Sequence, residues 1–182
     1  MSEPKKHAAL DLPSESAAAA ISDDKKAELA AVRLLARREH GVEELRRKLL
    51  RKGHCEDAVD KTVAKLQAKH LLSDERYAST LVHHQARRGQ GPIRIRAQLR
   101  QQGLKEEVIQ DNFAAAQPDW PQLATEVRRR KFGNSLPKSP AERAKQARFL
   151  QYRGFNADQI RAALKSEADF DVPNGSSDTD SI

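Results

Sequence analysis

The chain has 182 residues, of which 38% are hydrophobic, 32% charged and 4% aromatic, and its formal net charge is +7. So few aromatic residues argue against one large compact core, and no apolar run approaches the roughly 18 residues that a membrane span needs. A single cysteine, Cys55, cannot form an internal disulfide. We therefore expect a cytoplasmic protein that does not contact a membrane.

Charge is distributed unevenly along the chain. Residues 1–24 carry a net charge of −3 and residues 166–182 carry −5, so residues 25–165 carry +15. We expect residues 1–22 and 167–182 to be disordered tails, because serine, proline and acidic residues are frequent in them. The basic body suits a polyanionic or acidic partner. The simpler alternative is that scattered charge only keeps helices soluble.

The first unit, residues 23–72, is predicted to hold three helices. In the first of them Leu29, Val32 and Ala36 have the spacing of one helix face. The three helices are expected over about 24–41, 42–52 and 56–68.

Two further units, residues 73–117 and 118–166, repeat this arrangement. In the second unit Pro92 is expected in the first turn of a helix. In the third unit Ser139, Pro140 and Glu142 predict a capping box, and Asn156 with Gln159 gives another helix start. The helices are expected over about 74–88, 93–102, 105–116 and 120–131, with two more that begin after Ser139 and after Asn156.

Glycines at positions 53, 103 and 154 mark the repeat, since they are spaced by 50 and then 51 residues. Each follows a basic helical stretch and precedes an apolar pair with helical spacing. We interpret these glycines as helix ends in the left-handed conformation, which is favoured over a phosphate-binding loop. The residue after each glycine is expected to pack back on the preceding turn. The predicted fold is all-α, an elongated tandem array of three divergent three-helix repeats.

Residues that could carry chemistry do not form a recognisable constellation. The stretch "GQGPIRIR" lacks the spacing of a nucleotide-binding loop. The adjacent His83 and His84 point about 100° apart on a helix and cannot chelate one metal together. Cys55 stands beside His54, but adjacency in sequence does not make a nucleophile and its base. We therefore expect no enzyme, no metal and no cofactor.

Basic side chains are the better candidates for function. On a helical wheel Val42, Leu45 and Leu49 share one face while cations spread over the other, and the pattern recurs in the later units. A track of arginines could lie along a phosphate backbone or a nucleoprotein filament. Helix carboxyl ends also favour cations locally, so each residue has an equally good structural explanation. The candidate contact residues are Arg37, Arg38, Arg46, Arg47, Lys48, Arg51, Lys52, Arg87, Arg88, Arg94, Arg96, Arg100, Arg128, Arg129, Arg130, Lys131 and Arg153.

Three segments in this order, "ARREHGVEELRRKLLRKG", "SDERYASTLVHHQARRGQGPIRIRAQLRQQGL" and "RRKFGNSLPKSPAERAKQARFLQYRGF", resemble the bacterial recombination regulator RecX family. The resemblance covers about residues 29–164. It implies a non-enzymatic regulator that lies in the groove of the RecA recombinase filament on DNA and limits filament growth, ATP hydrolysis, strand exchange and repressor cleavage. The implied context is homologous recombination, DNA repair and the SOS response. The expected partners are the RecA filament and single- and double-stranded DNA with weak sequence preference, bound by a monomer.

Two other functions compete with this one. A general DNA- or RNA-binding helical module would also explain the basic body. Stacking-based recognition of single strands is poorly supported, because Phe113, Phe155 and Tyr152 are expected to pack in or beside repeat positions. A helical scaffold for acidic proteins is a third, weaker possibility.

Overall fold

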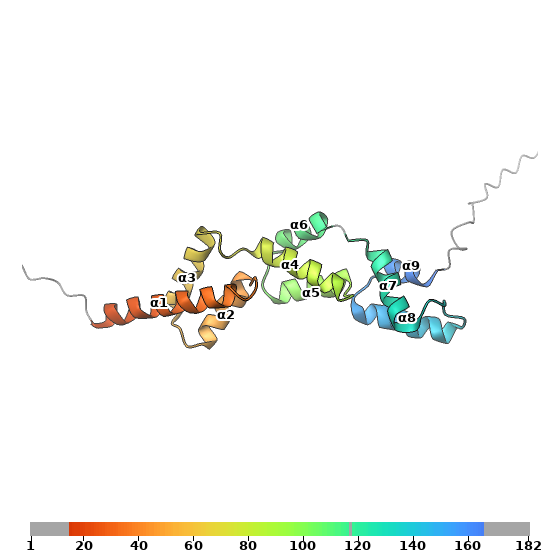
Figure 1. The fold of residues 1–182 in the computed structure, drawn as a ribbon, viewed down its shortest axis with the longest axis horizontal. Coiled ribbons are helices and arrows are strands. Elements are labelled where there is room, and N and C mark those ends of the chain that lie inside the picture. Colours follow the sequence, from red (N-terminus) through yellow and green to blue (C-terminus); the bar gives the residue numbers. More distant parts are fainter. Residues whose placement is uncertain (1–14, 117, 166–182) are drawn as a thin grey trace, which may run out of the picture. The chain divides into compact units, whose positions relative to one another are not determined.

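The computed structural model describes residues 15–116 and 118–165, with side chains from residue 23 onward. Within that part the chain forms nine α-helices and no strand, which confirms the predicted all-α fold (Figure 1). The chain divides into two compact units, unit 1 (Met1–Asp74) and unit 2 (Glu75–Ile182). The helices are α1 (Glu15–Leu35), α2 (Val42–Arg51), α3 (Glu56–Ala68), α4 (Asp74–Arg87), α5 (Pro92–Gln101), α6 (Glu106–Ala116), α7 (Trp120–Phe132), α8 (Pro140–Arg153) and α9 (Ala157–Leu164).

Helix α1 differs from its prediction in start, end and face. The expected span is about 24–41, whereas the helix ends at Leu35 and residues 36–41 form a turn and loop. It begins at Glu15, so residues 15–22, expected in the amino-terminal tail, are helical; an alanine run at 17–20 has high helix propensity. The rest of that tail and the predicted acidic tail lie outside the described residues. Leu29 and Val32, which suggested a core face, are 52% and 44% exposed, whereas Ala27 and Ala31 are fully buried. Small alanine side chains let α1 approach α3 closely, and this contact decides the face.

Unit 1 is a three-helix bundle in which α1, α2 and α3 all contact one another. The leucines on the predicted apolar face of α2, Leu45 and Leu49, are fully buried, as is Val59 of α3. Carboxylates distant in sequence cap two of the helices. Asp74 Oδ1 accepts from the Val42 N–H of α2 at 2.9 Å. Asp23 Oδ2 accepts from the Cys55 N–H at the start of α3 at 3.0 Å, and these bonds satisfy helix donors that lack partners within the helix.

Unit 2 contains two cores that are joined. One packs α4, α5 and α6 around buried residues such as Ile95, Leu99 and Phe113. The other packs α7, α8 and α9 around Leu150 and Phe155. The partly buried side chains of Trp120 and Leu123 pack against both cores, so the second and third repeats share apolar contacts.

All three repeat glycines have the predicted left-handed conformation, with φ of 88° at Gly53, 89° at Gly103 and 90° at Gly154. In each repeat the glycine N–H donates to the carbonyl three residues back, and the next N–H donates to the carbonyl five residues back. This pair of bonds is the Schellman motif. Leu104 and Phe155, which follow two of the glycines, are buried as predicted.

The end of α8 is joined to the start of α5 through the backbone. The Gly91 N–H donates to the Arg153 carbonyl at 2.8 Å, and the Ile93 N–H donates to the Gly154 carbonyl at 3.0 Å. A Cβ added to Gly91 would lie 2.3 Å from the Gly154 carbonyl oxygen, and one added to Gly154 would lie 2.4 Å from the Arg94 Cβ. We call this contact the glycine joint; it couples the second and third repeats and accepts no side chain at either glycine.

Two predicted helix starts are observed in the third repeat. Asn156 and Gln159 form the complete capping box. Ser139 Oγ accepts from the Glu142 N–H at 3.2 Å, with Pro140 at the first helical position. The return bond differs from a capping box, since Glu142 Oε2 accepts from the Lys138 N–H.

Candidate functional site

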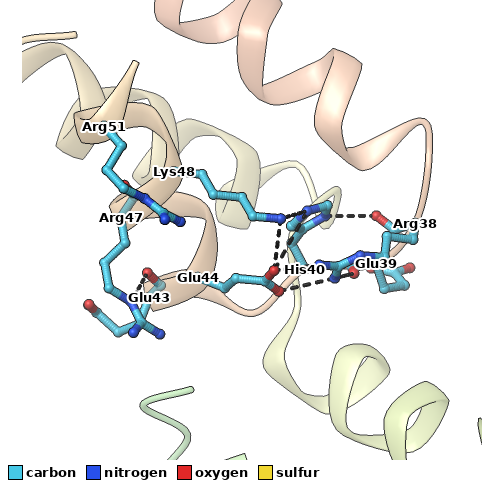
Figure 2. A network of polar contacts seen from close by, with 8 residues as sticks. All are labelled: Arg38, Glu39, His40, Glu43, Glu44, Arg47, Lys48 and Arg51. Carbon is cyan, nitrogen blue, oxygen red and sulfur yellow. Dashed lines mark hydrogen bonds and ion pairs between the residues drawn. The ribbon is translucent and has the colours of Figure 1, made fainter. Parts of the chain in front are cut away.

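Two of the candidate cations in unit 1 belong to a compact polar network between the end of α1 and the start of α2 (Figure 2). Glu44 is its centre. It accepts hydrogen bonds from Arg38, one of them at 3.1 Å, and an ion pair with Lys48 measures 2.9 Å. The His40 ring is 2% exposed, with Nδ1 2.9 Å from the Arg38 carbonyl and Nε2 3.0 Å from Lys48 Nζ. The network thus ties Arg38 and Lys48, both candidate contact residues, to the inside of unit 1.

The chemistry of these contacts fixes the protonation state of His40. A carbonyl only accepts and an ammonium only donates, so Nδ1 carries the proton and Nε2 accepts from Lys48. Burial lowers the pKa of His40 and outweighs the opposing effect of the bond to the Arg38 carbonyl. Burial alone would raise the pKa of Glu44, but the hydrogen bonds from Arg38 and Lys48 lower it to about 2. The network is therefore built for a neutral histidine and an ionised glutamate.

Arg46 also has an internal role. Its Nε donates to Asp60 Oδ1 at 2.8 Å, and a second nitrogen bonds Glu56, so the side chain joins α2 to α3. These two partners, led by Asp60, raise the pKa of Arg46. Its neighbours on α2 face solvent: Arg47 and Arg51 each donate to the backbone carbonyl four residues earlier.

In the second repeat, Arg96 and Arg100 both face Glu106. Arg100 makes two bonds to it, at 2.8 and 2.9 Å, while Arg96 lies 3.9 Å away. The hydrogen bonds to Glu106 raise the pKa of Arg100, and those from Arg100 lower the pKa of Glu106. The Arg96 guanidinium also lies over the Phe113 ring, 4.1 Å from its centroid. Both arginines thus connect α5 to α6.

Arg128 was predicted to be a contact residue for a partner, but it is buried. Its exposed fraction is 2%, and its guanidinium donates to the carbonyls of Gly133, Asn134 and Ser135, the last at 2.9 Å. Burial, followed by the charge of Arg129, lowers the pKa of Arg128. The side chain holds the turn after α7 and has no free surface to offer a partner.

The run of four cations at the end of α7 therefore divides into one internal and three exposed residues. Arg129 and Lys131 face solvent, and Arg130 pairs with Glu126 at 3.3 Å. A sequence signal for this division exists, since position 128 shares a helix face with Ala124, which is fully buried.

Several candidates are exposed and contact no carboxylate within residues 23–116 and 118–165. They occur in all three repeats and lie near helix carboxyl ends. Arg94 and Arg153 behave differently, because their guanidiniums bond the carbonyls of Tyr152 and Arg88, both at 3.2 Å. The exposed set consists of Arg37, Arg51, Lys52, Arg87, Arg88, Arg129 and Lys131.

Tyr152 overturns a second expectation. Expected to pack, it is instead 76% exposed, with the Arg94 guanidinium 5.4 Å from its ring centroid. The argument against stacking on an exposed aromatic ring therefore does not hold at this position. Sequence pattern placed Tyr152 beside the packed Phe155 but could not show on which side of the helix end each ring lies.

The described residues hold no group of three or more His, Cys, Asp or Glu side chains that could bind a metal ion. Among these residues, none of the helices has both the length and the apolar character of a membrane span.

Comparison with known proteins identifies the repeats. The models for the first, second and third three-helix domains of RecX match residues 27–66, 73–111 and 119–164. The regulatory protein RecX of Halorhodospira halophila is 45% identical over 146 residues, which are 80% of this chain and 90% of that protein. The regulatory protein RecX of Vibrio vulnificus is 40% identical over 138 residues, 76% of this chain and 90% of that protein.

Solved structures agree with this assignment. A crystal structure of regulatory protein RecX is similar with a TM-score of 0.72 and 25% identity, covering 86% of this chain and 80% of that one. The crystal structure of RecX from Lactobacillus salivarius shares the fold with a TM-score of 0.64 at 22% identity, covering 79% of this chain and 96% of that one. The matched proteins are regulatory proteins and not enzymes. With three matching domain models in chain order and relatives at 40–45% identity, this chain belongs to the RecX family.

Proposed function

We propose that this chain binds RecA recombinase filaments on DNA as a monomer and restrains their recombinase, ATPase and coprotease activities. Family membership supports a regulatory role. The resemblance of the quoted basic segments to the recombination regulators supplies RecA as the partner.

One observation carries the proposal beyond family membership: exposed cations without a carboxylate partner among the described residues recur in every repeat. Arg51 and Lys52 stand in the first, Arg87 and Arg88 in the second, and Lys131 in the third. Cations that were needed only inside the fold would have internal partners, as Arg46 and Arg100 do. Contacts spread over linked repeats bind through avidity, so each contact can be modest.

The first test is DNA-dependent ATP hydrolysis by preformed RecA filaments, titrated with this protein while free single-stranded DNA is in excess. Inhibition at amounts well below one protein per RecA supports recognition of the filament. Inhibition that disappears as free DNA is added contradicts the proposal, because the basic surface would then only compete for phosphate.

A matched pair of variants tests the exposed cations of unit 1. Arg51→Glu with Lys52→Glu changes the charge by the same amount as Lys25→Glu with Lys26→Glu. All four residues are exposed and adjacent in pairs, but only the first pair belongs to the candidate set. We expect the first double variant to inhibit ATP hydrolysis less, with unchanged circular dichroism, and the second to retain inhibition. Equal loss in both would show that only net charge matters.

A general nucleic-acid-binding module remains the second candidate. The exposed ring of Tyr152 beside Arg94 favours it, because it provides an aromatic platform next to cations. It predicts equal binding to DNA in the presence and absence of RecA.

A further inference from the structure

A hollow in unit 2 gathers four cationic side chains. Its volume is about 180 Å³, and the ends of α4, α7 and α8 form its wall. Val127 and Phe149 provide apolar surface within it. The cations that line it are Arg88, Arg130, Lys131 and Arg153.

The charge of this hollow remains positive after its internal partners are counted. Glu126 pairs with Arg130 and removes one of the four charges. The carboxyl ends of α4 and α7 each contribute roughly half a negative charge. The end of α8 contributes less, because its carbonyls accept from the N–H groups of Gly91 and Ile93 at the glycine joint. About two positive charges are left, which is more than helix ends require and suits an anionic group.

Arg153, which lines the hollow, and Arg94, which lies beside Tyr152, are both held in place by contacts within unit 2. Arg153 donates to the Arg88 carbonyl at 3.2 Å while its guanidinium lies 5.3 Å from the Phe149 ring centroid, which fixes it between α4 and α8. Arg94 donates to the Tyr152 carbonyl at 3.2 Å. A guanidinium fixed by such contacts presents its remaining N–H groups in a defined geometry, as phosphate recognition requires.

One residue before Arg153, which lines the hollow, the fold leaves an aromatic ring in solvent. Tyr152 precedes Arg153 directly, and 76% of its surface is exposed. The Arg94 guanidinium lies over the ring, and Ile93, which precedes Arg94 in α5, is 55% exposed. A base that stacks on such a platform gains about 1–3 kcal/mol.

The size of the hollow limits what it can hold. Pockets for whole small molecules measure about 300–1,000 Å³, whereas this one measures about 180 Å³. It has room for a single anionic group, with the rest of the ligand lying outside. A nucleotide chain meets this condition, because one phosphate enters while the neighbouring base reaches Tyr152. Bases of a duplex are already stacked and paired, so the platform favours single strands.

We propose that Tyr152 and the hollow lined by Arg88, Arg130, Lys131 and Arg153 form a binding site for single-stranded nucleic acid. A base stacks on Tyr152 and a backbone phosphate binds among the cations. The inference deepens the proposed function by assigning the DNA contact, on which it rests, to particular residues of unit 2.

The test uses the full chain alone and measures fluorescence anisotropy of a labelled 20-nucleotide oligothymidine and of a 20-base-pair duplex. Tyr152→Ala is expected to weaken binding of the single strand by roughly 5- to 150-fold, which is the stacking energy converted to affinity. Duplex binding should change less than twofold, and Tyr152→Phe should bind as the wild type does. Unchanged single-strand binding by Tyr152→Ala overturns the proposal.

A second pair of variants tests the binding of phosphate. Arg88→Gln with Lys131→Gln should reduce the dependence of log affinity on log salt by about 0.7 for a single strand, because the one phosphate in the hollow is no longer neutralised. Lys145→Gln with Arg148→Gln removes the same charge from exposed residues of α8 outside the hollow and should leave the slope near that of the wild type. Equal slopes for both double variants would contradict the site.

The outcome is separable from that of the proposed function, because RecA is absent from these measurements. If Tyr152→Ala weakens inhibition of RecA ATP hydrolysis but not DNA binding, the ring contacts protein and the nucleic-acid site is refuted. If Tyr152→Ala loses binding to the single strand and the wild type does not inhibit RecA, the nucleic-acid site is supported and the proposed function is refuted.

Discussion

Three glycine-to-alanine variants would measure the strength of the glycine joint. Gly53→Ala changes a residue with φ of 88° whose added Cβ would meet nothing within 4 Å. Gly91→Ala is the opposite case, because φ is −84° and suits any residue while the Cβ would lie 2.3 Å from the Gly154 carbonyl oxygen. Gly154→Ala combines both features, with φ of 90° and a Cβ 2.4 Å from the Arg94 Cβ. The set separates backbone strain from steric contact.

The expected losses of unfolding free energy follow from these contacts. Positive φ costs an alanine about 1 kcal/mol, which is the whole effect at Gly53. The atoms that an added Cβ would meet, the Gly154 carbonyl oxygen and the Arg94 Cβ, belong to the backbone or are fixed to it, so no side-chain rotation relieves the contact. The two repeats must therefore move apart, which breaks the two backbone hydrogen bonds of 2.8 and 3.0 Å. At about 1 kcal/mol for each bond, Gly91→Ala should lose about 2 kcal/mol. Gly154→Ala should lose about 3 kcal/mol, the sum of strain and contact.

Urea titrations can resolve these losses. Trp120, the single tryptophan, packs in unit 2 and reports its unfolding by fluorescence, whereas far-ultraviolet circular dichroism reports both units. Gly91→Ala and Gly154→Ala should move the Trp120 transition to lower urea, and Gly53→Ala should leave it in place. An unchanged Trp120 midpoint in Gly91→Ala would refute the close approach of the two repeats.

Three further outcomes are expected. Arg128→Met should destabilise unit 2 by about 2–4 kcal/mol, measured by Trp120 fluorescence, because three turn carbonyls lose their donor; a change below about 1 kcal/mol would show that water replaces the guanidinium. Unit 1 should lose stability as pH falls from 7 to 5, because the unfolded chain protonates His40 near its ordinary pKa of 6.5 while the fold favours the neutral ring. His40→Asn should flatten the urea midpoint against pH in this window, and an unaltered slope would exclude the ring as its source. Glu44→Gln should instead reduce the stability loss between pH 4.5 and about 2, the range set by its lowered pKa, while Asp23, whose pKa is also lowered to about 2, keeps its own share of the loss; a loss equal to that of the wild type in acid titrations would exclude Glu44.

The helices were predictable from local signals, and the reason is visible at particular residues. Gly53, Gly103 and Gly154 end their helices in the left-handed conformation that only glycine adopts without strain. The expected limits of α3, 56–68, coincide with the observed Glu56–Ala68. Capping and termination depend on neighbours within a few residues, so the sequence contains the information they need.

Side-chain placement was predictable only in part, because it depends on residues far apart in sequence. The buried face of α1 uses Ala27 and Ala31, which hydrophobicity ranks below the exposed Leu29. Asp23 caps α3 across 32 positions, a bond that no local pattern contains. Among the candidate contact residues, a buried arginine and an exposed one have the same letter and the same charge. Helical spacing places Arg128 on the face of Ala124, but only the packing of the turn after α7 shows that its guanidinium is enclosed.

The two hydrogen bonds of the glycine joint also make two backbone amides sensitive to separation of the second and third repeats. The N–H groups of Gly91 and Ile93 have their partners in another repeat, whereas the later amides of α5 bond within their own helix. Their hydrogens can exchange with deuterated water when the second and third repeats separate, even while α5 stays helical. The exchange rates at these two amides, compared with those in the middle of α5, would give the free energy of separating the two repeats. Slower exchange in the presence of a filament or of nucleic acid would show that binding holds the repeats together.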